Sequence, residues 1–458
     1  MKVSIVGTGY VGLSTGALLA AAGHKVYCID VDQSKIDTIK TGKSYFFEPG
    51  LDNFVKLGID SGNLIPTLDY SEAIPDSEVA IISVGTPQAD DGSVDLKYIF
   101  QAANSIKDNL QGDLIVVQKS TVPVGTGREL EKIFAKTDYK VDIISCPEFL
   151  AQGSAVLDTL NMDRFVVGSD SDEAKDKIIE LFSTINDLLQ SEDLDDYVQF
   201  ASMYRKSKIF KDVPFKERVL SLGLESAELI KVTANAFLAS KISFANYIAQ
   251  VCDQVGANVN EVMEGIGMDE RIGRSFLYAG LGWGGGCFPK DVEGLIHFAD
   301  SVGVDFKMLK AARDVNFGQV DYSIKNIKEA LGDDLKGKTA TVLGLSFKPG
   351  TSDVRQSPAI ELVTALLVEG MQVKVYDPKA MDEAKKIIKD RVYYAQGLND
   401  ALENAEITIL ATDWPDFNDI DFADYVDIVK EKNLFDARNR WDRSKAEEAG
   451  FKFYAIGR

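Results

Sequence analysis

The chain has 458 residues, and its 50 basic and 71 acidic residues give a formal net charge of −21. This length allows about two to four domains, and a hydrophobic content of 45% is ordinary for globular proteins, which excludes wholesale disorder. So acidic a chain repels phosphate backbones, which argues against nucleic acids or anionic membranes as its main partners. A small anionic ligand is still compatible with this charge, because local backbone dipoles act at short range.

Cysteine and histidine usage narrows the chemistry further. The four cysteines (Cys28, Cys146, Cys252 and Cys287) form no CxxC pair, which fits neither a disulfide scaffold nor a structural zinc site. With only two histidines in the chain, we expect no bound metal and no histidine-based proton relay. The first residues lack a signal-peptide pattern, and no run approaches about 18 apolar residues. We therefore predict a cytoplasmic protein that does not cross a membrane.

The first residues are typical of a βαβ unit. Residues 3–6 predict a buried strand, Gly7-Thr8-Gly9-Tyr10-Val11-Gly12 follows it, and an alanine- and leucine-rich helix ends at Gly23. A second strand closes on Asp30. In such a unit the first glycine permits a tight turn, the second lets a pyrophosphate approach the backbone, and the third lets helix and strand pack closely.

The acidic residue after the second strand indicates which dinucleotide this loop would hold. Asp30 would accept hydrogen bonds from the adenosine ribose hydroxyls and repel a 2′-phosphate, which favours NAD over NADP. A turn of this shape without a cofactor is the plain structural alternative, and FAD is a second one that no further flavin signal supports. We predict NAD.

Three more apolar strands, at 79–84, 114–119 and 141–145, alternate with helical stretches and predict a parallel, doubly wound sheet. We assign residues 1–222 to an NAD-binding domain of this kind. Its last part, 192–222, is acidic and then basic and aromatic, and breaks the pattern. We interpret 192–222 as an atypical insertion, with a partner or regulatory surface as the alternative.

A long helix is predicted from Glu225 to Val255, with an apolar face too broad for a helix that packs on one side against water. We expect it to pack between domains or across a dimer interface, within a central helical region at 223–325. A second α/β pattern begins near Thr339, so residues 326–458 form the C-terminal domain. The predicted fold class is therefore α/β, with two Rossmann-like, doubly wound parallel-sheet domains joined by a long central helix.

The most informative stretch surrounds Cys287. Three glycines, residues 284–286, precede this cysteine and let backbone amides converge on a ligand. Pro289 suits the first turn of a helix, so Cys287 would lie near a positive helix end with Lys290 close by, and both effects favour the thiolate. Asp291 would lie one turn further on the same face. The plain alternative is a small buried hydrophobic residue, which is how we interpret the other three cysteines.

Lys231 and Asn235 are four residues apart on the predicted long helix and so project from one face. Such a pair could donate hydrogen bonds to a developing oxyanion. A solvated lysine and a helix-surface asparagine are the alternative.

Together these motifs resemble the UDP-glucose 6-dehydrogenase family, within the nucleotide-sugar 6-dehydrogenases. The matching segments occur in the family's order over most of the chain: the Gly7–Gly12 loop, Lys119-Ser120-Thr121-Val122-Pro123, Pro147-Glu148-Phe149-Leu150, the Glu225–Ala236 helix, Arg271-Ile272-Gly273, the glycine-rich Cys287 loop, and Ser346-Phe347-Lys348 with Asp353-Val354-Arg355.

The resemblance implies a double oxidation, in which the C6 alcohol of UDP-glucose becomes a carboxylate while two NAD are reduced. It implies that Cys287 captures the aldehyde as a thiohemiacetal, which a second hydride loss converts to a thioester. Lys231 would stabilise oxyanions with help from Asn235. The resemblance also implies that Asp291 and Thr121 position a water that takes part in proton transfer. Glu148 would assist hydrolysis of the thioester.

The resemblance also implies two sets of binding residues. Those for NAD are Gly7, Gly9, Tyr10, Val11, Gly12, Asp30, Lys35, Thr86, Thr121, Gln152, Lys290 and Arg355. Those for the sugar nucleotide are Glu148, Phe149, Leu150, Ala151, Gln152, Lys231, Asn235, Arg271, Phe276, Leu277, Tyr278, Ala279, Gly280, Gly284 and Lys348. In the family the residue at Arg271 reaches a neighbouring subunit's substrate, which implies a homodimer or a higher homo-oligomer built on the long helix.

Two departures from the family pattern affect these expectations. Gln152 stands where the family usually has a glutamate, so we assign hydrolysis to Glu148. The segment at 194–222 is longer than usual, which affects interdomain geometry or regulation. The alternatives are another nucleotide-sugar 6-dehydrogenase (for a UDP-N-acetylhexosamine or GDP-mannose), a single-hydride hydroxyacid dehydrogenase, and an NAD-binding regulatory protein with an oxidisable thiol.

Overall fold

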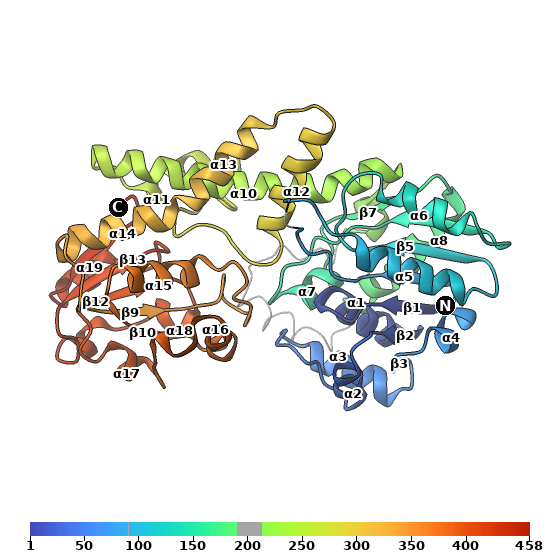
Figure 1. The fold of residues 1–458 in the computed structure, drawn as a ribbon, viewed down its shortest axis with the longest axis horizontal. Helices are drawn as coiled ribbons and strands as arrows, with labels where there is room; N and C mark the ends of the chain where they lie inside the picture. Colours follow the sequence, from blue (N-terminus) through green and yellow to red (C-terminus); the bar gives the residue numbers. More distant parts are fainter. Residues whose placement is uncertain (90, 190–212) are drawn as a thin grey trace. The chain divides into compact units, whose positions relative to one another are not determined.

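Two β-sheets organise the chain in the computed structural model, which describes residues 1–89, 91–189 and 213–458. One sheet lies in a first unit, Met1–Ala234, and the other in a second unit, Asn235–Arg458. In both units helices cover both faces of the sheet (Figure 1).

The first sheet has the strand order β3-β2-β1-β4-β5-β6-β7-β8. Successive residues of a strand point to opposite faces, so one strand supplies two apolar layers. In β4, Val79 and Ile81 belong to the layer on one face, and Ala80 and Ile82 to the layer on the other. The strands are β1 Lys2–Val6, β2 Lys25–Ile29, β3 Leu64–Thr67, β4 Val79–Ile82, β5 Leu114–Gln118, β6 Val141–Ser145, β7 Phe165–Gly168 and β8 Val219–Leu222.

The end of this sheet differs from the predicted all-parallel pattern. Strands β1 to β6 pair in parallel, but β7 is antiparallel to β6, and β8 pairs in parallel with β7. Residues 192–212 of the predicted insertion lie outside the described residues. From residue 213 on, the chain contributes to the sheet and core, since Phe215 is buried and β8 is the edge strand.

The helices of the first unit connect these strands. The predicted helix after the glycine loop is α1, and Gly9 is its N-cap. The helices are α1 Tyr10–Ala21, α2 Gln33–Lys40, α3 Leu51–Asp60, α4 Tyr70–Ala73, α5 Lys97–Asp108, α6 Thr126–Phe134, α7 Ala155–Leu160 and α8 Asp172–Leu188.

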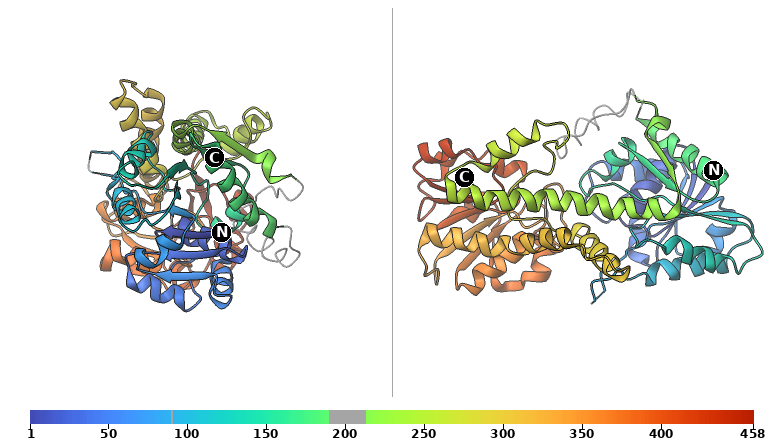
Figure 2. Two further views of the ribbon diagram at one scale, coloured as in Figure 1. Left: turned by 90° about the vertical axis from the view of Figure 1, so that its right-hand side faces the viewer. Right: turned by 90° about the horizontal axis from the view of Figure 1, so that it is seen from above.

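The predicted long helix is α10, Leu224–Val255, which continues from the first unit into the second (Figure 2, yellow-green). Neither proline nor glycine interrupts it, and six of its 32 residues are alanine, the best helix former. Three further helices, α11 Val259–Gly267, α12 Phe288–Ser301 and α13 Lys307–Phe317, follow before α14 Gln319–Leu331 leads to the second sheet.

The second sheet is entirely parallel, with the order β11-β10-β9-β12-β13-β14. Its strands are β9 Thr339–Leu343, β10 Gln372–Tyr376, β11 Tyr393–Tyr394, β12 Ile407–Leu410, β13 Asn433–Asp436 and β14 Lys452–Ala455. Its helices are α15 Pro358–Val368, α16 Met381–Ile388, α17 Leu398–Leu402, α18 Pro415–Asn418 and α19 Arg443–Glu448. The C-terminus lies against α11, where the Val259 N–H donates to the Gly457 carbonyl (Figure 1). The predicted fold class, two Rossmann-like sheets and a long helix, is confirmed.

Candidate functional site

The glycine loop after β1 has the geometry of a phosphate cradle. Gly7 has a φ of +95°, and a Cβ at this position would lie 2.8 Å from the Ser83 carbonyl oxygen. A Cβ at Gly12 would lie 2.0 Å from the Gly7 oxygen, so both positions need glycine. A Cβ at Gly9, by contrast, would meet no described atom within 4 Å. The open side at the N-terminus of α1 is where an anion would be bound by backbone amides.

Asp30 lies directly after β2 and faces this loop. Its carboxylate accepts hydrogen bonds from the Thr8 N–H (3.0 Å) and hydroxyl (2.6 Å) and from the Asp32 N–H (3.1 Å), while Lys35 Nζ lies 3.4 Å away. Burial alone disfavours the charged carboxylate, but these hydrogen bonds and Lys35 outweigh it and hold the pKa of Asp30 below its ordinary value. Asp30 is therefore an anionic hydrogen-bond acceptor beside the cradle.

Tyr45 completes this corner, and the sequence patterns did not indicate it. Its hydroxyl donates to the Thr8 carbonyl at 3.1 Å, and Lys35 Nζ lies 5.2 Å from the centre of its ring. Burial and the nearby carboxylates of Asp30 and Asp32 raise the pKa of Tyr45 above its usual value. The phenol thus stays protonated and holds the glycine loop from outside.

The carboxyl ends of β4 and β5 bring two predicted cofactor residues together. The buried Thr86 donates its hydroxyl proton to the Thr121 carbonyl at 2.9 Å. The hydroxyl of Ser120, the residue before Thr121, donates to the Val84 carbonyl at 2.7 Å. These bonds fix the two loops to each other at the edge of the sheet where ligands of such folds bind.

Glu148 and Lys231 form a buried ion pair of 3.1 Å between the loop after β6 and α10, with each side chain at most 5% exposed. Glu148 also accepts the Leu150 N–H at 2.6 Å, and Lys231 Nζ lies 5.6 Å from the Phe149 ring centre. Leaving either charge buried without the other would be costly, so this pair fixes the position of both groups. The structure brings together two residues predicted as catalytic.

Two further carboxylates position these loops, and both escaped the sequence patterns. Glu228, one turn before Lys231 on α10, accepts the N–H groups of Gly125 and Gly127, each at 2.7 Å. Burial raises the pKa of Glu228. Glu48 accepts the N–H groups of Gly153 and Ala155, each at 2.7 Å, and so anchors the loop that carries Ala151 and Gln152.

In the second unit the predicted cysteine is the N-cap of α12, with Pro289 in the first turn as predicted. Cys287 is partly exposed, whereas Cys28, Cys146 and Cys252 are buried. The buried Asp291 accepts hydrogen bonds from Asn235 Nδ2 at 2.5 Å and from Lys290 Nζ at 2.6 Å. A helix N-terminus thus carries a thiol, a cation and a fixed carboxylate within one turn.

The glycine run before Cys287 has a packing role as well as the predicted one. A Cβ at Gly284 would lie 2.0 Å from the Gln356 carbonyl oxygen, and one at Gly286 would lie 2.5 Å from the Arg355 guanidinium. Arg355 itself is paired with Asp353 at 2.6 Å. Gly284 is therefore required by the close approach of the Gln356 backbone, which sequence alone does not reveal, whereas the Arg355 side chain at Gly286 could move aside.

A cavity of about 620 Å³ opens beside the predicted substrate segment, residues 276–280. Tyr278 and Ala279 line it together with three arginines, Arg274, Arg438 and Arg440. The guanidinium groups of Arg274 and Arg440 lie 4.6 and 5.6 Å from the centre of the Tyr278 ring.

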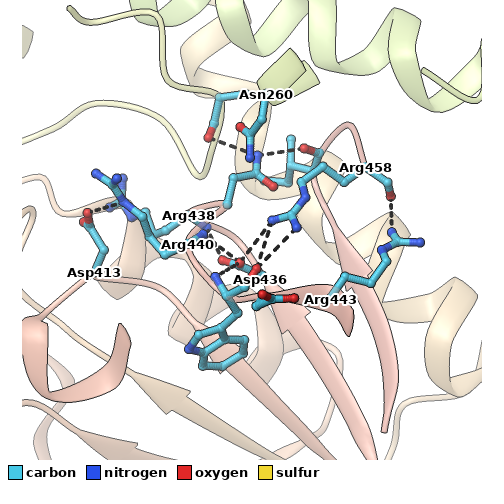
Figure 3. A network of polar contacts seen from close by, with 12 residues as sticks. Asn260, Asp413, Asp436, Arg438, Arg440, Arg443 and Arg458 are labelled. Atoms are coloured by element: carbon cyan, nitrogen blue, oxygen red, sulfur yellow. Dashed lines mark hydrogen bonds and ion pairs between the residues drawn. The ribbon is translucent and has the colours of Figure 1, made fainter. Parts of the chain in front are cut away.

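Two of these arginines come from the loop after β13, which is folded around Asp436 (Figure 3). The buried Asp436 carboxylate accepts the N–H groups of Arg438, Arg440 and Trp441 at 2.7 to 3.0 Å. Arg438 donates to the carbonyls of Ala411 and Gly282, and its Nη2 finds no hydrogen-bond partner among the described residues. The Arg-Asn-Arg sequence after a buried strand is the signal that could have revealed this cation pair.

Three further predicted substrate residues, Arg271, Phe276 and Lys348, are partly or fully exposed. Arg271 lies on the surface and pairs with Asp269 at 2.5 Å. Phe276 has a φ of +66°, and Lys348 lies in the loop after β9 with its Nζ 5.8 Å from the Phe347 ring centre.

Comparison with known proteins accounts for this layout. Residues 1–186 match the NAD binding domain of the UDP-glucose/GDP-mannose dehydrogenase family, residues 225–317 its central domain, and residues 341–443 its UDP binding domain. The chain belongs to this family. The resemblance noted in the sequence is thereby confirmed, and the chain is an NAD-dependent dehydrogenase.

Relatives and solved structures match over the whole chain. It is 40% identical to UDP-glucose 6-dehydrogenase TuaD of Bacillus subtilis, covering 100% of this chain and 93% of that protein. It is 38% identical to UDP-glucose 6-dehydrogenase of Rhizobium meliloti, covering both chains completely. The structure of a UDP-glucose dehydrogenase from Pyrobaculum islandicum matches with a TM-score of 0.86 at 33% identity, covering 100% of this chain and 97% of that one. Among the residues that the structure describes, none of the helices combines the length and the apolar content that a membrane span requires.

Proposed function

We propose that this dehydrogenase oxidises UDP-glucose twice at C6, giving UDP-glucuronate and two NADH. The observation that carries the proposal is the full-length match to relatives named UDP-glucose 6-dehydrogenase, at 40% and 38% identity. A double oxidation also gives a reason for the partly exposed Cys287, since oxidation of an alcohol to an aldehyde needs no thiol.

The first unit fits the cofactor. The open side at Gly9, the amides at the N-terminus of α1 and the Asp30 carboxylate supply the groups that a dinucleotide's pyrophosphate and ribose need. When bound, NAD accepts one hydride in each oxidation. Asp30, with its lowered pKa, stays ionised at neutral pH and would repel a 2′-phosphate.

We propose that the reaction at Cys287 proceeds in four steps. The C6 alcohol loses a hydride and a proton to give an aldehyde. The Cys287 thiolate adds to the aldehyde carbon, and the resulting oxyanion takes up a proton to form a thiohemiacetal. Loss of a second hydride and that proton gives a thioester. Water then attacks the thioester carbon, and the carboxylate leaves as the thiol is regenerated.

The contacts within each unit support the roles of the other groups. Lys231, held by Glu148, is a buried cation suited to stabilising oxyanions, with Asn235 as a further donor. Asp291, whose carboxylate is fixed by two donors, would hold a water for proton transfer together with Thr121. We assign assistance in thioester hydrolysis to Glu148, because Gln152 cannot act as a base.

The second unit would bind the nucleotide. Arg438 and Arg440 line the 620 Å³ cavity beside residues 276–280, and a pair of guanidinium groups there supports the proposal that they bind the diphosphate. Lys348, in the loop after β9, is the further cation that we assign to the substrate. We therefore propose three functional parts: residues 1–222 bind NAD, residues 223–325 form the central helical region, and residues 326–458 bind the UDP moiety.

We also propose a cytoplasmic homodimer built on α10. Five large apolar residues of this helix are at least 52% exposed in the single chain: Phe237, Phe244, Tyr247, Val251 and Val255. Their spacings of seven, three, four and four residues place them along one face. Burial of this face against a second copy would remove a stripe that monomers rarely expose. Light scattering of the purified protein should give at least twice the mass of one chain.

The decisive experiment is NADH formed per UDP-glucose consumed, with the sugar nucleotide limiting. We expect about two NADH per UDP-glucose in the wild type and almost no turnover to UDP-glucuronate in Cys287→Ala. Cys252→Ala, which removes a buried thiol from α10, is the matched control and should keep the ratio. Full turnover in Cys287→Ser would favour the single-hydride alternative instead.

A different nucleotide sugar is the second candidate substrate. The chain is 26% identical to a UDP-D-ManNAc dehydrogenase from Pyrococcus horikoshii, with a TM-score of 0.82 over 100% of this chain and 99% of that one. If UDP-glucose gives no NADH, activity with a UDP-N-acetylhexosamine or GDP-mannose would support this candidate. NAD binding without NADH from any of them would contradict the enzymatic proposal.

A further inference from the structure

The segment that leads to the glycine run, residues 279–283, belongs to no helix or strand, yet other parts of the second unit bind its backbone groups one by one. On one side it contacts residues 437–439, which follow β13. The bonds on this side are Ala279 O from Asn439 Nδ2 (3.2 Å), Leu281 N to Ala437 O (2.9 Å) and Gly282 O from Arg438 Nη1 (3.3 Å).

On the other side, buried side chains of three helices hold the same segment. Both backbone groups of Gly280 are bound: its N–H donates to Asn246 Oδ1 at 2.7 Å, and its carbonyl accepts from Gln319 Nε2 at 2.8 Å. Asn246 comes from α10 and Gln319 from α14, and both side chains are fully buried.

Trp283 is held most completely. Asn316, near the end of α13, accepts the Trp283 N–H on its Oδ1 at 2.7 Å and donates its Nδ2 to the Trp283 carbonyl at 3.0 Å. One amide side chain thus satisfies both backbone groups of one residue, as a neighbouring β-strand would. The indole Nε1 donates to the Ser243 hydroxyl at 3.0 Å. Gly282 has a φ of +107°, and a Cβ there would lie 2.6 Å from Asn316 Oδ1, so the fit is close.

We propose that Asn316 is a positioning residue that sets where the Cys287 thiol stands. Trp283 is the last residue with a side chain before three glycines, which have none to fix them, so its placement defines the origin of the cysteine loop. Asn316 is only 8% exposed, and its loss would leave two buried backbone groups without partners. This inference rests on the proposed function of Cys287 as the nucleophile.

The test is Asn316→Ala in the full-length enzyme, with NAD and UDP-glucose as substrates. We expect kcat to fall about 10- to 100-fold, because misplacement of a reacting group by about 1 Å costs that much. The KM for NAD should change less than about twofold, since the glycine loop that holds the cofactor belongs to the first unit. Asn326→Ala is the matched control, because Asn326 donates to the Tyr322 carbonyl of its own helix, α14, and should leave both constants unchanged.

Thiol alkylation gives a second measurement that a merely structural role would not move. The other three cysteines are buried, so iodoacetamide should modify Cys287 first in the folded enzyme. We expect Asn316→Ala to change the rate of Cys287 alkylation at least about threefold and to shift its pH profile, whereas Asn326→Ala should not.

The outcome that overturns the proposal is a lowered melting temperature with wild-type kcat and wild-type alkylation of Cys287. If Asn316→Ala does not fold, Ser243→Ala is the second variant. It removes the acceptor of the indole N–H together with the hydroxyl that donates to the Ala312 carbonyl, and it should show the same effects at a smaller size. Unchanged alkylation in that variant overturns the proposal equally. Failure of the proposed function is separate, because Cys287→Ala would then keep full turnover while the alkylation measurement still reports on the position of the thiol.

Discussion

The two sheets use the same turn for different purposes. In each, a glycine with positive φ follows the first strand, Gly7 (+95°) after β1 and Gly344 (+92°) after β9, and its N–H donates to the end of the second strand at 2.8 Å. An aspartate then follows the second strand, Asp30 after β2 and Asp377 after β10, and accepts N–H groups of the glycine turn.

The difference lies in how much hydrogen-bonding capacity the protein leaves to a ligand. Asp377 is 1% exposed and accepts from the Leu345, Ser346, Lys379 and Ala380 N–H groups and from the Trp414 indole. Asp30 is 8% exposed, and its partners are two backbone N–H groups, the Thr8 hydroxyl and Lys35 at 3.4 Å.

The helices begin at different distances from the turn as well. After Gly7 the helix α1 begins at Tyr10, whereas after Gly344 the chain runs to Pro358 before α15 starts. That longer connection carries Lys348 and Arg355. The same topology therefore offers a dinucleotide cradle in one unit and a closed turn with a long, cation-bearing loop in the other.

The largest effect should come from Asp377→Ala. It would leave four backbone N–H groups without this acceptor and the Trp414 indole N–H with the Ser346 hydroxyl alone, and we expect a loss of about 3–5 kcal/mol in the free energy of unfolding. Urea unfolding followed by circular dichroism measures it. Asp333→Ala, an exposed position just after α14, is the control and should stay within about 0.5 kcal/mol of wild type. A change this small at Asp377 would contradict its structural role.

Asp30→Ala should act mainly on the cofactor. Loss of a charged acceptor for the ribose hydroxyls is expected to weaken NAD binding about 10- to 100-fold, equivalent to about 1.5–3 kcal/mol. Titration of NADH fluorescence in the folded variant measures this, with Asp37→Ala on the exposed face of α2 as the control. Unchanged affinity would mean that Asp30 is as closed to ligands as Asp377, and the contrast between the two units would fail.

Trp414→Phe should weaken the closed turn by a smaller amount. The indole Nε1 lies 3.1 Å from Asp377 and 3.2 Å from the Ser346 hydroxyl, so phenylalanine keeps most of the buried ring and removes one donor. We expect a loss of about 1–2 kcal/mol in stability with NAD affinity unchanged. Weaker NAD binding in this variant would show that the second turn takes part in cofactor binding.

The sequence predicted the first unit's cradle better than its supports. The Gly7–Gly12 loop and Asp30 lie within one βαβ unit, where short spacings carry the pattern. Glu48 and Glu228 escaped notice because they bind backbone groups of segments about 100 residues away, and spacing says nothing about such pairs. Asp377 was missed as well, because the Leu345 and Ser346 N–H groups that it binds also lie far from it in the sequence.

The second unit shows the same limit. The turn at Gly344 lacks the later glycines of a dinucleotide loop, so no motif draws attention to the aspartate that closes it. Cys287 and the start of α12 were predictable from residues 284–291, because proline and glycine act locally. Asn316 was not, since a lone asparagine near a helix end has no pattern of its own.

The smallest expected effect is on stability at acid pH, and it concerns the contacts of Asp30. Burial opposes the charge of Asp30, but the Thr8 and Asp32 hydrogen bonds and Lys35 lower its pKa below the unfolded value of about 3.9. A carboxyl group with a lowered pKa in the folded state adds stability above the unfolded pKa and loses it as the pH falls through the folded pKa. Asp30→Asn should therefore flatten the decline in stability below about pH 4, which urea midpoints between pH 3 and 7 measure. An equally steep decline in the variant would mean that the Thr8 and Lys35 contacts do not stabilise the Asp30 carboxylate in solution. The folded protein alone would then not keep this acceptor ionised, and the bound cofactor would be needed to do so.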